Sequence, residues 1–248
     1  MAGVTPEAGS RTAWVVGATG GIGEQATYRL HEAGYRVAFS GRRSPELARV
    51  AERLTGDRHV GVEVDVASET SVRQALATVI DHFEGLDAVV FCAGTNVPRR
   101  SLTELSWTDW ESVVDVNLSG AARVSLAALP HLRRAGSGSI VFISSWVARH
   151  PLAGSGAAYA ASKKGIAGLV EAINFEHGRD GVRATAIQPG FVDTDFLGWR
   201  DDPPTEEQRR GMLTAADVAD VVTYVVGAPP RVCISELLLV GVSDTSLG

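Results

Sequence analysis

The chain is poor in cysteine, in aromatic side chains and in long apolar runs. Among its 248 residues there are only two cysteines, Cys92 and Cys233, and aromatic residues make up 6%. Two cysteines are too few for a fold held by disulfides, and because each lies in an apolar run we expect buried free thiols. No stretch of about 18 uninterrupted apolar residues occurs, so we expect no membrane-spanning helix.

The chain also lacks an excess of basic residues and the layout of a secretion signal. Its 23 basic and 29 acidic residues give a net charge of -6. That balance disfavours nucleic acid as a partner but permits a local basic pocket for a phosphorylated ligand. Because the N-terminus shows no basic segment followed by an apolar one, we expect a cytoplasmic protein with neither a membrane nor nucleic acid as partner.

Short apolar, β-branched runs alternate with longer segments of helical period. Strands are predicted at 12–16, 37–39, 60–64, 88–91, 139–143, 184–187 and 234–240. Helices are predicted at 21–33, 45–55, 70–83, 107–135, 157–178 and 215–226. Strands that are apolar throughout are typical of a sheet covered on both faces. We therefore predict an α/β fold, a single Rossmann-type domain with a doubly wound parallel sheet of about seven strands and helices on both faces.

The domain is predicted to span residues 12–240, between a flexible N-terminal tail at 1–11 and a C-terminal tail at 241–248. Within it, charged residues and prolines interrupt any regular period over residues 193–213. Long irregular segments in compact folds often cover a site, so we predict that 193–213 is a substrate lid.

A glycine-rich turn follows the first predicted strand and opens the first predicted helix. It reads Gly17-Ala18-Thr19-Gly20-Gly21-Ile22-Gly23. Glycines allow a tight turn and close approach to a pyrophosphate, and the helix N-terminus offers free N–H groups to that anion. In this strand-turn-helix setting the motif predicts a dinucleotide site, and the alternative is a glycine turn without a ligand.

No acidic residue stands at the end of the second predicted strand. Enzymes that prefer NAD commonly use Asp or Glu there to hold the ribose 2′-hydroxyl. This chain instead continues with Arg42 and Arg43. Because guanidinium groups match a phosphate with paired donors, the segment favours NADP(H). The alternative is that both arginines are ordinary solvated charges.

Four polar residues form a candidate catalytic group. The spacing of Tyr159 and Lys163 puts both side chains on one helix face, where an ammonium is expected to lower the pKa of the tyrosine. Ser145 closes the fifth strand at the carboxyl edge of the sheet, and Asn117 lies in an apolar helix where an amide needs a partner. Each residue alone is more often structural, but together they predict acid–base chemistry, and no metal site is predicted.

These motifs, in this order over residues 12–240, resemble the classical short-chain dehydrogenase/reductase family. Gly17 to Gly23 is similar to its glycine turn, and Asp65-Val66 to its adenine-contacting pair. Asn117, Ser145, Tyr159 and Lys163 resemble its tetrad. Further cofactor contacts that the resemblance implies are Thr19, Gly21, Ile22, Ala93, Gly94, Tyr159, Lys163, Pro189, Gly190, Val192 and Thr194.

The resemblance implies an oxidoreductase that moves a hydride between NADP(H) and a small ketone or secondary alcohol. Tyr159 would protonate the carbonyl oxygen and Ser145 would hydrogen-bond it. Lys163 would hold the nicotinamide ribose and tune Tyr159, and Asn117 would order a water of the proton relay.

The chain departs from the family pattern at three places. Val16 stands where a threonine is usual, and Phe91-Cys92 replaces two asparagines before Ala93-Gly94. The interval from Ser145 to Tyr159 is also one residue longer than usual, which leaves Ser144 as an alternative to Ser145.

The substrate pocket is expected among residues 95–99, 146–156 and 191–211. Trp146, Phe191, Phe196 and Trp199 are its candidate substrate contacts, and they suggest a hydrophobic or cyclic substrate. Loop packing or subunit contact is the alternative for both tryptophans. For an anionic substrate, the candidate cations are Arg99, Arg149 and Arg200.

A homodimer or homotetramer is a further expectation from the resemblance. The residues expected to form its helix-pairing faces are Val113, Val116, Ala121, Val124, Ala160, Ile166, Leu169 and Ile173. Two other functions remain open: a non-catalytic dinucleotide sensor or scaffold, and an epimerase or dehydratase acting on a nucleotide sugar.

Overall fold

The computed structural model describes residues 11–150, 154–199 and 204–242, and the side chain of Trp199 is excluded. The tails predicted at 1–11 and 241–248 therefore lie almost entirely outside the described residues. Of the predicted lid at 193–213, residues 200–203 lie outside them as well.

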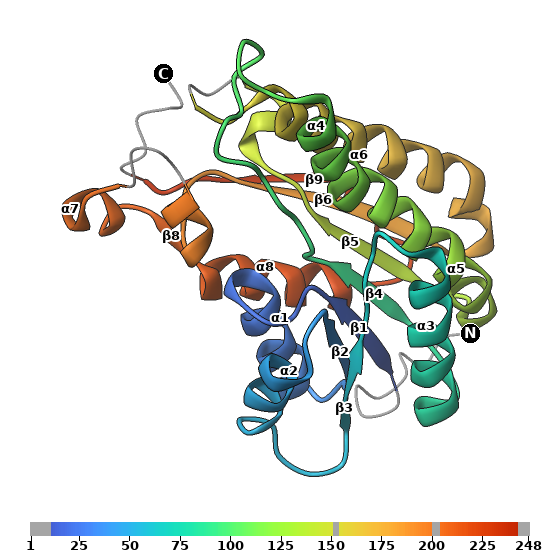
Figure 1. The fold of residues 1–248 in the computed structure, drawn as a ribbon. Helices are drawn as coiled ribbons and strands as arrows, with labels where there is room; N and C mark the ends of the chain where they lie inside the picture. The colour runs from blue at the N-terminus through green and yellow to red at the C-terminus, as the bar shows by residue number, and fades with distance from the viewer. Residues whose placement is uncertain (1–10, 151–153, 200–203, 243–248) are drawn as a thin grey trace.

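Seven strands form one parallel sheet, which confirms the predicted fold class (Figure 1). From edge to edge they are β3 (His59–Glu63), β2 (Arg36–Gly41), β1 (Thr12–Val16), β4 (Ala88–Phe91), β5 (Ser139–Ile143), β6 (Arg183–Pro189) and β9 (Glu236–Leu239). The strand order changes direction between β1 and β4. β1 pairs with β2 on one side and with β4 on the other, so that Val15 of β1 lies between Phe39 of β2 and Val90 of β4. At such a switch point the loops after adjacent strands diverge and leave a crevice at the carboxyl edge.

Helices cover both faces of the sheet (Figure 1). On one face lie α1 (Gly21–Glu32), α2 (Ser44–Ala51) and α8 (Ala215–Gly227). On the other lie α3 (Glu69–Phe83), α5 (Gly120–Ala135) and α6 (Ala157–His177), and α4 (Trp107–Val114) packs on α6.

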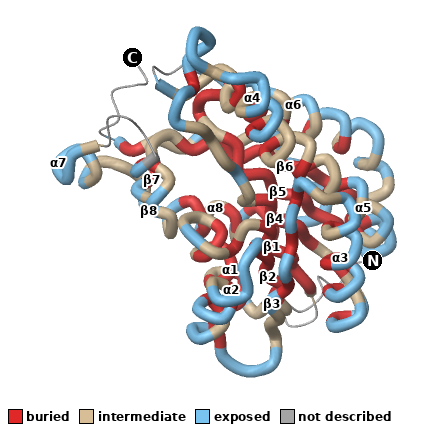
Figure 2. Tube along the Cα trace, viewed as in Figure 1, coloured by how far each residue is buried: buried red, intermediate tan, exposed pale blue. Residues whose placement is uncertain are grey.

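The strands are buried on both sides, as Figure 2 shows for the centre of the molecule. In β1, Trp14 and Val16 enter one apolar core, whereas Ala13 and Val15 enter the other. Alternation between two apolar cores explains why the strands read as continuous apolar runs in the sequence.

Two segments differ from the predicted elements. Residues 107–135 do not form one uniform helix, because Asp115–Ser119 makes a turn of π-helix between α4 and α5. Residues 193–213 contain the 3-10 turn Asp195–Trp199 and α7 (Glu206–Arg209). The two ends of this segment are joined by parallel pairing of β7 (Val192–Asp193) with β8 (Leu213–Thr214). Elements of two to five residues are too short to leave a periodic signal in the sequence.

Two expectations about buried surfaces are wrong. Both cysteines are free, but Cys233 is exposed and only Cys92 is partly buried. Most residues expected to pair helices between subunits lie inside this chain, with Val113 and Ala121 fully buried and Ile166 nearly so. Those helix faces are apolar because they cover the sheet. None of the described helices is long and apolar enough to cross a membrane.

Candidate active site

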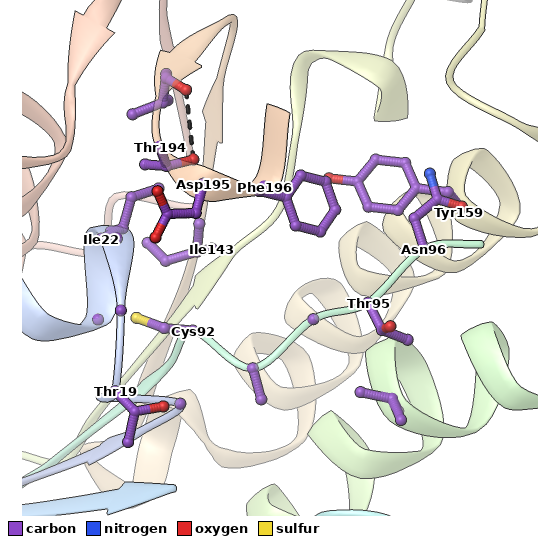
Figure 3. A pocket seen from close by; sticks show the side chains of 18 of the residues that line it. Thr19, Ile22, Cys92, Thr95, Asn96, Ile143, Tyr159, Thr194, Asp195 and Phe196 are labelled. Carbon is purple, nitrogen blue, oxygen red and sulfur yellow. Dashed lines mark hydrogen bonds between the residues drawn. The ribbon is translucent and has the colours of Figure 1, made fainter. Parts of the chain in front are cut away.

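A cleft of about 560 Å³ opens at the carboxyl edge of the sheet (Figure 3). The loops after β1, β2, β3, β4, β5 and β6 line it, together with the start of α6. Every residue predicted to contact the cofactor lies in its wall: Gly17, Thr19, Gly21, Ile22, Gly23, Arg42, Arg43, Asp65, Val66, Ala93, Gly94, Tyr159, Lys163, Pro189, Gly190, Val192 and Thr194. The fold therefore gathers in one cleft residues that are up to 177 positions apart, from Gly17 to Thr194.

The glycine turn is packed so closely that neither Gly17 nor Gly23 could carry a side chain. Gly17 has a φ of +88°, and a Cβ there would lie 2.5 Å from the backbone nitrogen of Ala93. A Cβ at Gly23 would overlap the carbonyl oxygen of Gly17. The N-cap of α1 is Gly20, which has no side chain to cap the first turn. The uncapped N–H groups at this helix end fit a pyrophosphate.

A charged network behind the turn holds it in place. Arg49 of α2 donates to the carbonyl oxygen of Thr19 at 3.0 Å and to the Glu24 carboxylate at 2.7 Å. Tyr28 donates to the same carboxylate at 3.0 Å. Burial would raise the pKa of Glu24, but the hydrogen bonds from Arg49 and Tyr28 outweigh it and hold this pKa below its usual value. Sequence reasoning missed the network, because Arg49 reaches Glu24 from a different helix.

The two arginines after β2 differ in their surroundings. The Arg43 guanidinium lies 2.5 Å from the Glu46 carboxylate. Over the described part of the chain, Arg42 makes no ion pair, and both arginines line the cleft. Arg42 is therefore the better placed of the two to receive a 2′-phosphate.

Tyr159 and Ser145 are brought together across the cleft wall. The Ser145 hydroxyl forms a hydrogen bond with the Tyr159 phenol and accepts one from the backbone N–H of Val147 at 3.3 Å. Ser144 instead donates to the carbonyl oxygen of Lys163 at 3.1 Å. Ser145 is not among the residues that line the cleft, whereas Ser144 is. The geometry favours Ser145 as the partner of Tyr159.

Burial dominates the acidity of Tyr159 and Lys163. Burial raises the pKa of Tyr159, and the hydrogen bond with Ser145 offsets only part of the rise. Burial lowers the pKa of Lys163 to about 8. The Lys163 ammonium donates to the carbonyl oxygen of Ile143 at 2.8 Å and lies 5.6 Å from the centre of the Tyr159 ring. The expectation that this ammonium lowers the pKa of Tyr159 is thus wrong for this structure, and the phenol stays protonated at neutral pH.

Asn117 lies in the π-helical turn and is fully buried. Its Oδ1 accepts from the backbone N–H of Thr95 at 2.8 Å, and its Nδ2 donates to the Thr95 carbonyl oxygen and to the Ser162 hydroxyl. The amide therefore joins the end of β4 to α6, one turn from Tyr159. Turns of π-helix are frequent at functional sites. The role of Asn117 in a water relay stays a prediction.

The departures from the family pattern leave the end of β4 well packed. Phe91 is buried against Phe142, with ring centres 6.3 Å apart. Burial raises the pKa of the Cys92 thiol to about 12, so that it remains neutral at the base of the cleft. The backbone N–H of Cys92 donates to the carbonyl oxygen of Val16 at 2.8 Å. These contacts maintain the strand end without the two asparagines.

Two of the four candidate substrate residues line the cleft. They are Phe191 and Phe196, and the Phe196 ring lies 5.9 Å from the Tyr159 ring, with the Tyr159 hydroxyl directed toward it (Figure 3). Trp146 does not line the cleft, because it is buried and stacked on His150 at 4.5 Å, as the packing alternative anticipated. The side chain of Trp199 lies outside the described part.

Neither of the two described cations that were candidates for an anionic substrate lines the cleft. Arg99 is exposed, Arg149 pairs with Glu236, and neither lines the cleft. Arg200 lies outside the described residues. Arg100, which is 8% exposed, lines it instead. The sequence carries no signal for this, since only the folded loop decides which of two adjacent arginines turns inward.

Comparison with known proteins points to the family that the sequence motifs resemble. The chain matches the family described as short chain dehydrogenase over residues 11–203. It is 32% identical over 229 residues to an uncharacterized oxidoreductase of Staphylococcus epidermidis, covering 92% of this chain and 96% of that protein. A similar oxidoreductase of Staphylococcus aureus is 31% identical over 227 residues, covering 92% and 95%.

Solved structures resemble the whole chain. A serine dehydrogenase complexed with NADP+ is 29% identical, with a TM-score of 0.88 over 96% of this chain and 97% of that one. An alcohol dehydrogenase of the archaeon Thermococcus sibiricus, complexed with 5-hydroxy-NADP, is 29% identical, with a TM-score of 0.81 over 94% and 97%.

The lowered pKa of Lys163 predicts how stability depends on pH. The unfolded lysine has a pKa near 10.5 and the folded one about 8, so between these values the unfolded chain binds more protons. The free energy of unfolding of the apo protein should therefore rise with pH in this range, by at most about 1.4 kcal/mol per pH unit. Urea unfolding of wild type and Lys163→Met from pH 7 to 9.5 measures it. A wild-type minus variant difference that stays flat contradicts the burial of a titrating ammonium.

Proposed function

Since the chain belongs to the short-chain dehydrogenase family, we propose that it transfers a hydride between NADP(H) and a small, hydrophobic or cyclic ketone or secondary alcohol. Tyr159 is the general acid and base. The observation that carries the proposal is the Tyr159 phenol, hydrogen-bonded to Ser145, in the wall of the glycine-lined cleft.

Three features support NADP(H) as the cofactor. The closely packed turn at Gly17 and the uncapped start of α1 suit a pyrophosphate. Arg42 lies where a 2′-phosphate would need a donor, and no carboxylate follows β2 directly. Both solved relatives named above are complexes with an NADP-type nucleotide.

The bound nicotinamide supplies or accepts the hydride, and the protein's groups handle the proton and the geometry. In the reductive direction the protonated Tyr159 donates its proton to the carbonyl oxygen while Ser145 hydrogen-bonds that oxygen. Lys163, held by the Ile143 carbonyl, would bind the nicotinamide ribose, and Asn117 would support the relay that returns a proton to Tyr159. Burial keeps the Tyr159 phenol protonated, so it is ready to donate a proton in the reductive direction.

The apolar part of the substrate is proposed to pack on Phe191 and Phe196. Leu197 and Val147 are further apolar residues of the cleft wall. Apolar walls with few polar groups are typical of small-molecule sites. The segment 193–213 carries Phe196, which is consistent with its proposed role as a lid.

A homodimer or homotetramer is also proposed. Leu126 on α5 is 70% exposed and Phe175 on α6 is 91% exposed, so each of these helices keeps an apolar residue outside the chain's own core. Light scattering should return a multiple of the 26.1 kDa chain mass, and a value near 26.1 kDa contradicts association.

Removing one hydroxyl tests the proposed acid. Tyr159→Phe should lower kcat by at least about 10²-fold, because general acid catalysis contributes about that much or more, while the Kd for NADPH changes little. NADPH oxidation with a panel of aryl and alicyclic ketones measures turnover, and cofactor fluorescence measures binding. Tyr224→Phe, which alters an exposed tyrosine of α8, is the control. Unchanged turnover in Tyr159→Phe refutes the assignment, and tight binding without turnover in the wild type favours the sensor.

Cofactor choice is tested at Arg42. Arg42→Ala should raise KM for NADPH by about tenfold or more and leave KM for NADH nearly unchanged, since a charge-assisted pair to the phosphate is lost. Arg43→Ala should have the smaller effect, because Glu46 already pairs with Arg43. If the ratio of the two KM values does not move in Arg42→Ala, the phosphate contact is elsewhere.

A further inference from the structure

Arg123, in the first turn of α5, joins two segments that are far apart in the chain. Its Nη1 donates to the carbonyl oxygen of Val66 at 3.1 Å. Its Nη2 pairs with the Asp115 carboxylate at 2.6 Å, and its Nη1 also donates to the Asp115 carbonyl oxygen at 3.4 Å. Val66 belongs to the loop after β3, whereas Asp115 opens the π-helical turn. One side chain therefore fastens this loop to this turn.

Both fastened segments contribute an apolar residue to the cleft. Val66 is buried in the cleft wall, and Val116, which follows Asp115 in the π-helical turn, lines the cleft as well. The next residue of the turn is Asn117, whose amide oxygen accepts from the N–H of Thr95. The turn is thus tied to Val66 on one side and to the end of β4 on the other.

Gly120 packs directly against Val66. A Cβ at this position would lie 2.9 Å from the Cγ2 of Val66 and 3.0 Å from its Cβ. The φ of Gly120 is -62° and its ψ is -43°, which are ordinary helical values. The glycine is therefore required for close packing rather than for its backbone conformation. Gly120 and Arg123 together hold Val66 from α5, and we call these two residues the Val66 seat.

The Val66 seat lies at the adenosine end of the proposed cofactor. β3 is the neighbour of β2 at the edge of the sheet, and the loop after β2 carries Arg42. Arg42 is the residue proposed to receive the phosphate on the adenosine ribose. With that phosphate at Arg42, the base on the same ribose reaches the loop after β3, where Val64 and Val66 line the cleft. Apolar side chains suit the faces of a purine ring.

We infer that Arg123 is a positioning residue for the adenine of the cofactor. Because it holds the Val66 carbonyl oxygen and the Asp115 turn together, it fixes Val66 and Val116 before the cofactor binds. A wall that is already ordered saves the free energy of ordering a loop around the ligand. Arg123 is not among the residues that line the cleft, so it acts through Val66. This inference rests on the proposed function and deepens it at the nucleotide end.

The ion pair with Asp115 alone would not give Arg123 this role. The two side chains are 27% and 39% exposed, and ion pairs that are partly exposed contribute little. Arg133, near the other end of α5, makes a similar pair with Asp180 at 2.8 Å. What distinguishes Arg123 is its further hydrogen bond to a residue of the cleft wall. Arg133→Met is therefore the matched control for Arg123→Met.

Fragments of the cofactor locate the effect of Arg123 along the cleft. NADPH, NADH and 2′,5′-ADP all contain adenine, whereas NMNH contains the nicotinamide without it. In Arg123→Met the Kd of the three adenine ligands should rise by a similar factor of about fivefold or more, because a charged hydrogen bond that fixes the wall is lost. The Kd of NMNH should change by less than about twofold, since distant sites behave independently. Cofactor fluorescence measures the reduced ligands on the full chain, and displacement of NADPH measures 2′,5′-ADP.

Gly120→Ala disturbs the Val66 seat without changing Arg123. Alanine favours a helix more than glycine does, so α5 itself is not weakened, but the new Cβ displaces Val66. The Kd of NADPH and of 2′,5′-ADP should rise again, with NMNH unchanged. This variant keeps the test decisive if Arg123→Met folds poorly. Arg123→Lys retains one donor without the fork, and should bind the adenine ligands more tightly than Arg123→Met does.

The controls separate positioning from a general loosening of the fold. Arg133→Met should leave the Kd of all four ligands unchanged, and kcat at saturating NADPH should be the same in Arg123→Met as in the wild type. Equal weakening of NMNH and 2′,5′-ADP, or an Arg133→Met effect as large as that of Arg123→Met, overturns the inference. An unchanged Kd of 2′,5′-ADP in both Arg123→Met and Gly120→Ala overturns it as well.

The wild type distinguishes this failure from failure of the proposed function. If it binds 2′,5′-ADP and reduces carbonyl compounds, and the variants bind the fragment equally well, only the positioning role of Arg123 is disproved. If the wild type binds neither NADPH nor NADH, the proposed function fails and this inference fails with it.

Discussion

The close packing of the glycine turn against the end of β4 is the constraint on which the site depends. With no side chain at Gly17, the turn lies directly on the backbone of Ala93, and with none at Gly23, α1 begins directly on the carbonyl of Gly17. This contact lets the loops after two adjacent strands meet at the edge of the sheet. It also leaves the start of α1 without a capping side chain, facing the cleft.

Burial governs the acid–base chemistry of the part of the cleft wall that carries Tyr159 and Lys163. One environment raises the pKa of Tyr159 and lowers that of Lys163, so it opposes the charged form of both. The ammonium is stabilised by a carbonyl oxygen of β5, whereas the hydroxyl of Ser145, just beyond that strand, favours the phenolate form of Tyr159 and offsets part of the effect of burial. Holding a titrating lysine in this position costs folding free energy, which is typical of sites arranged for function rather than stability.

The fold and the glycine turn of the cleft wall could be predicted from the sequence because both leave local patterns. Apolar runs such as Ser139–Ile143 mark strands, and glycines between a strand and a helix mark the turn. The pairing of Ser145 with Tyr159 was predicted from the resemblance, and the structure brings the two together.

What the sequence could not predict depends on contacts between distant segments. Trp146 turns inward onto His150 rather than into the cleft, and Arg100 lines the cleft where Arg99 does not. The pKa of Tyr159 followed burial, which is set by tertiary packing, rather than its spacing from Lys163. The π-helical turn at Asn117 leaves no periodic signal that separates it from the α-helices on either side.

Direct hydride transfer is the central claim, and isotope labelling tests it most directly. NADPH carrying deuterium at C4 of one face of the nicotinamide would be incubated with the wild type and the carbonyl compound that it reduces fastest. The account predicts one deuterium at the carbinol carbon of each product molecule for one labelled face and none for the other. A product without deuterium from either face, or bound NADPH that reduces no carbonyl compound, would contradict it.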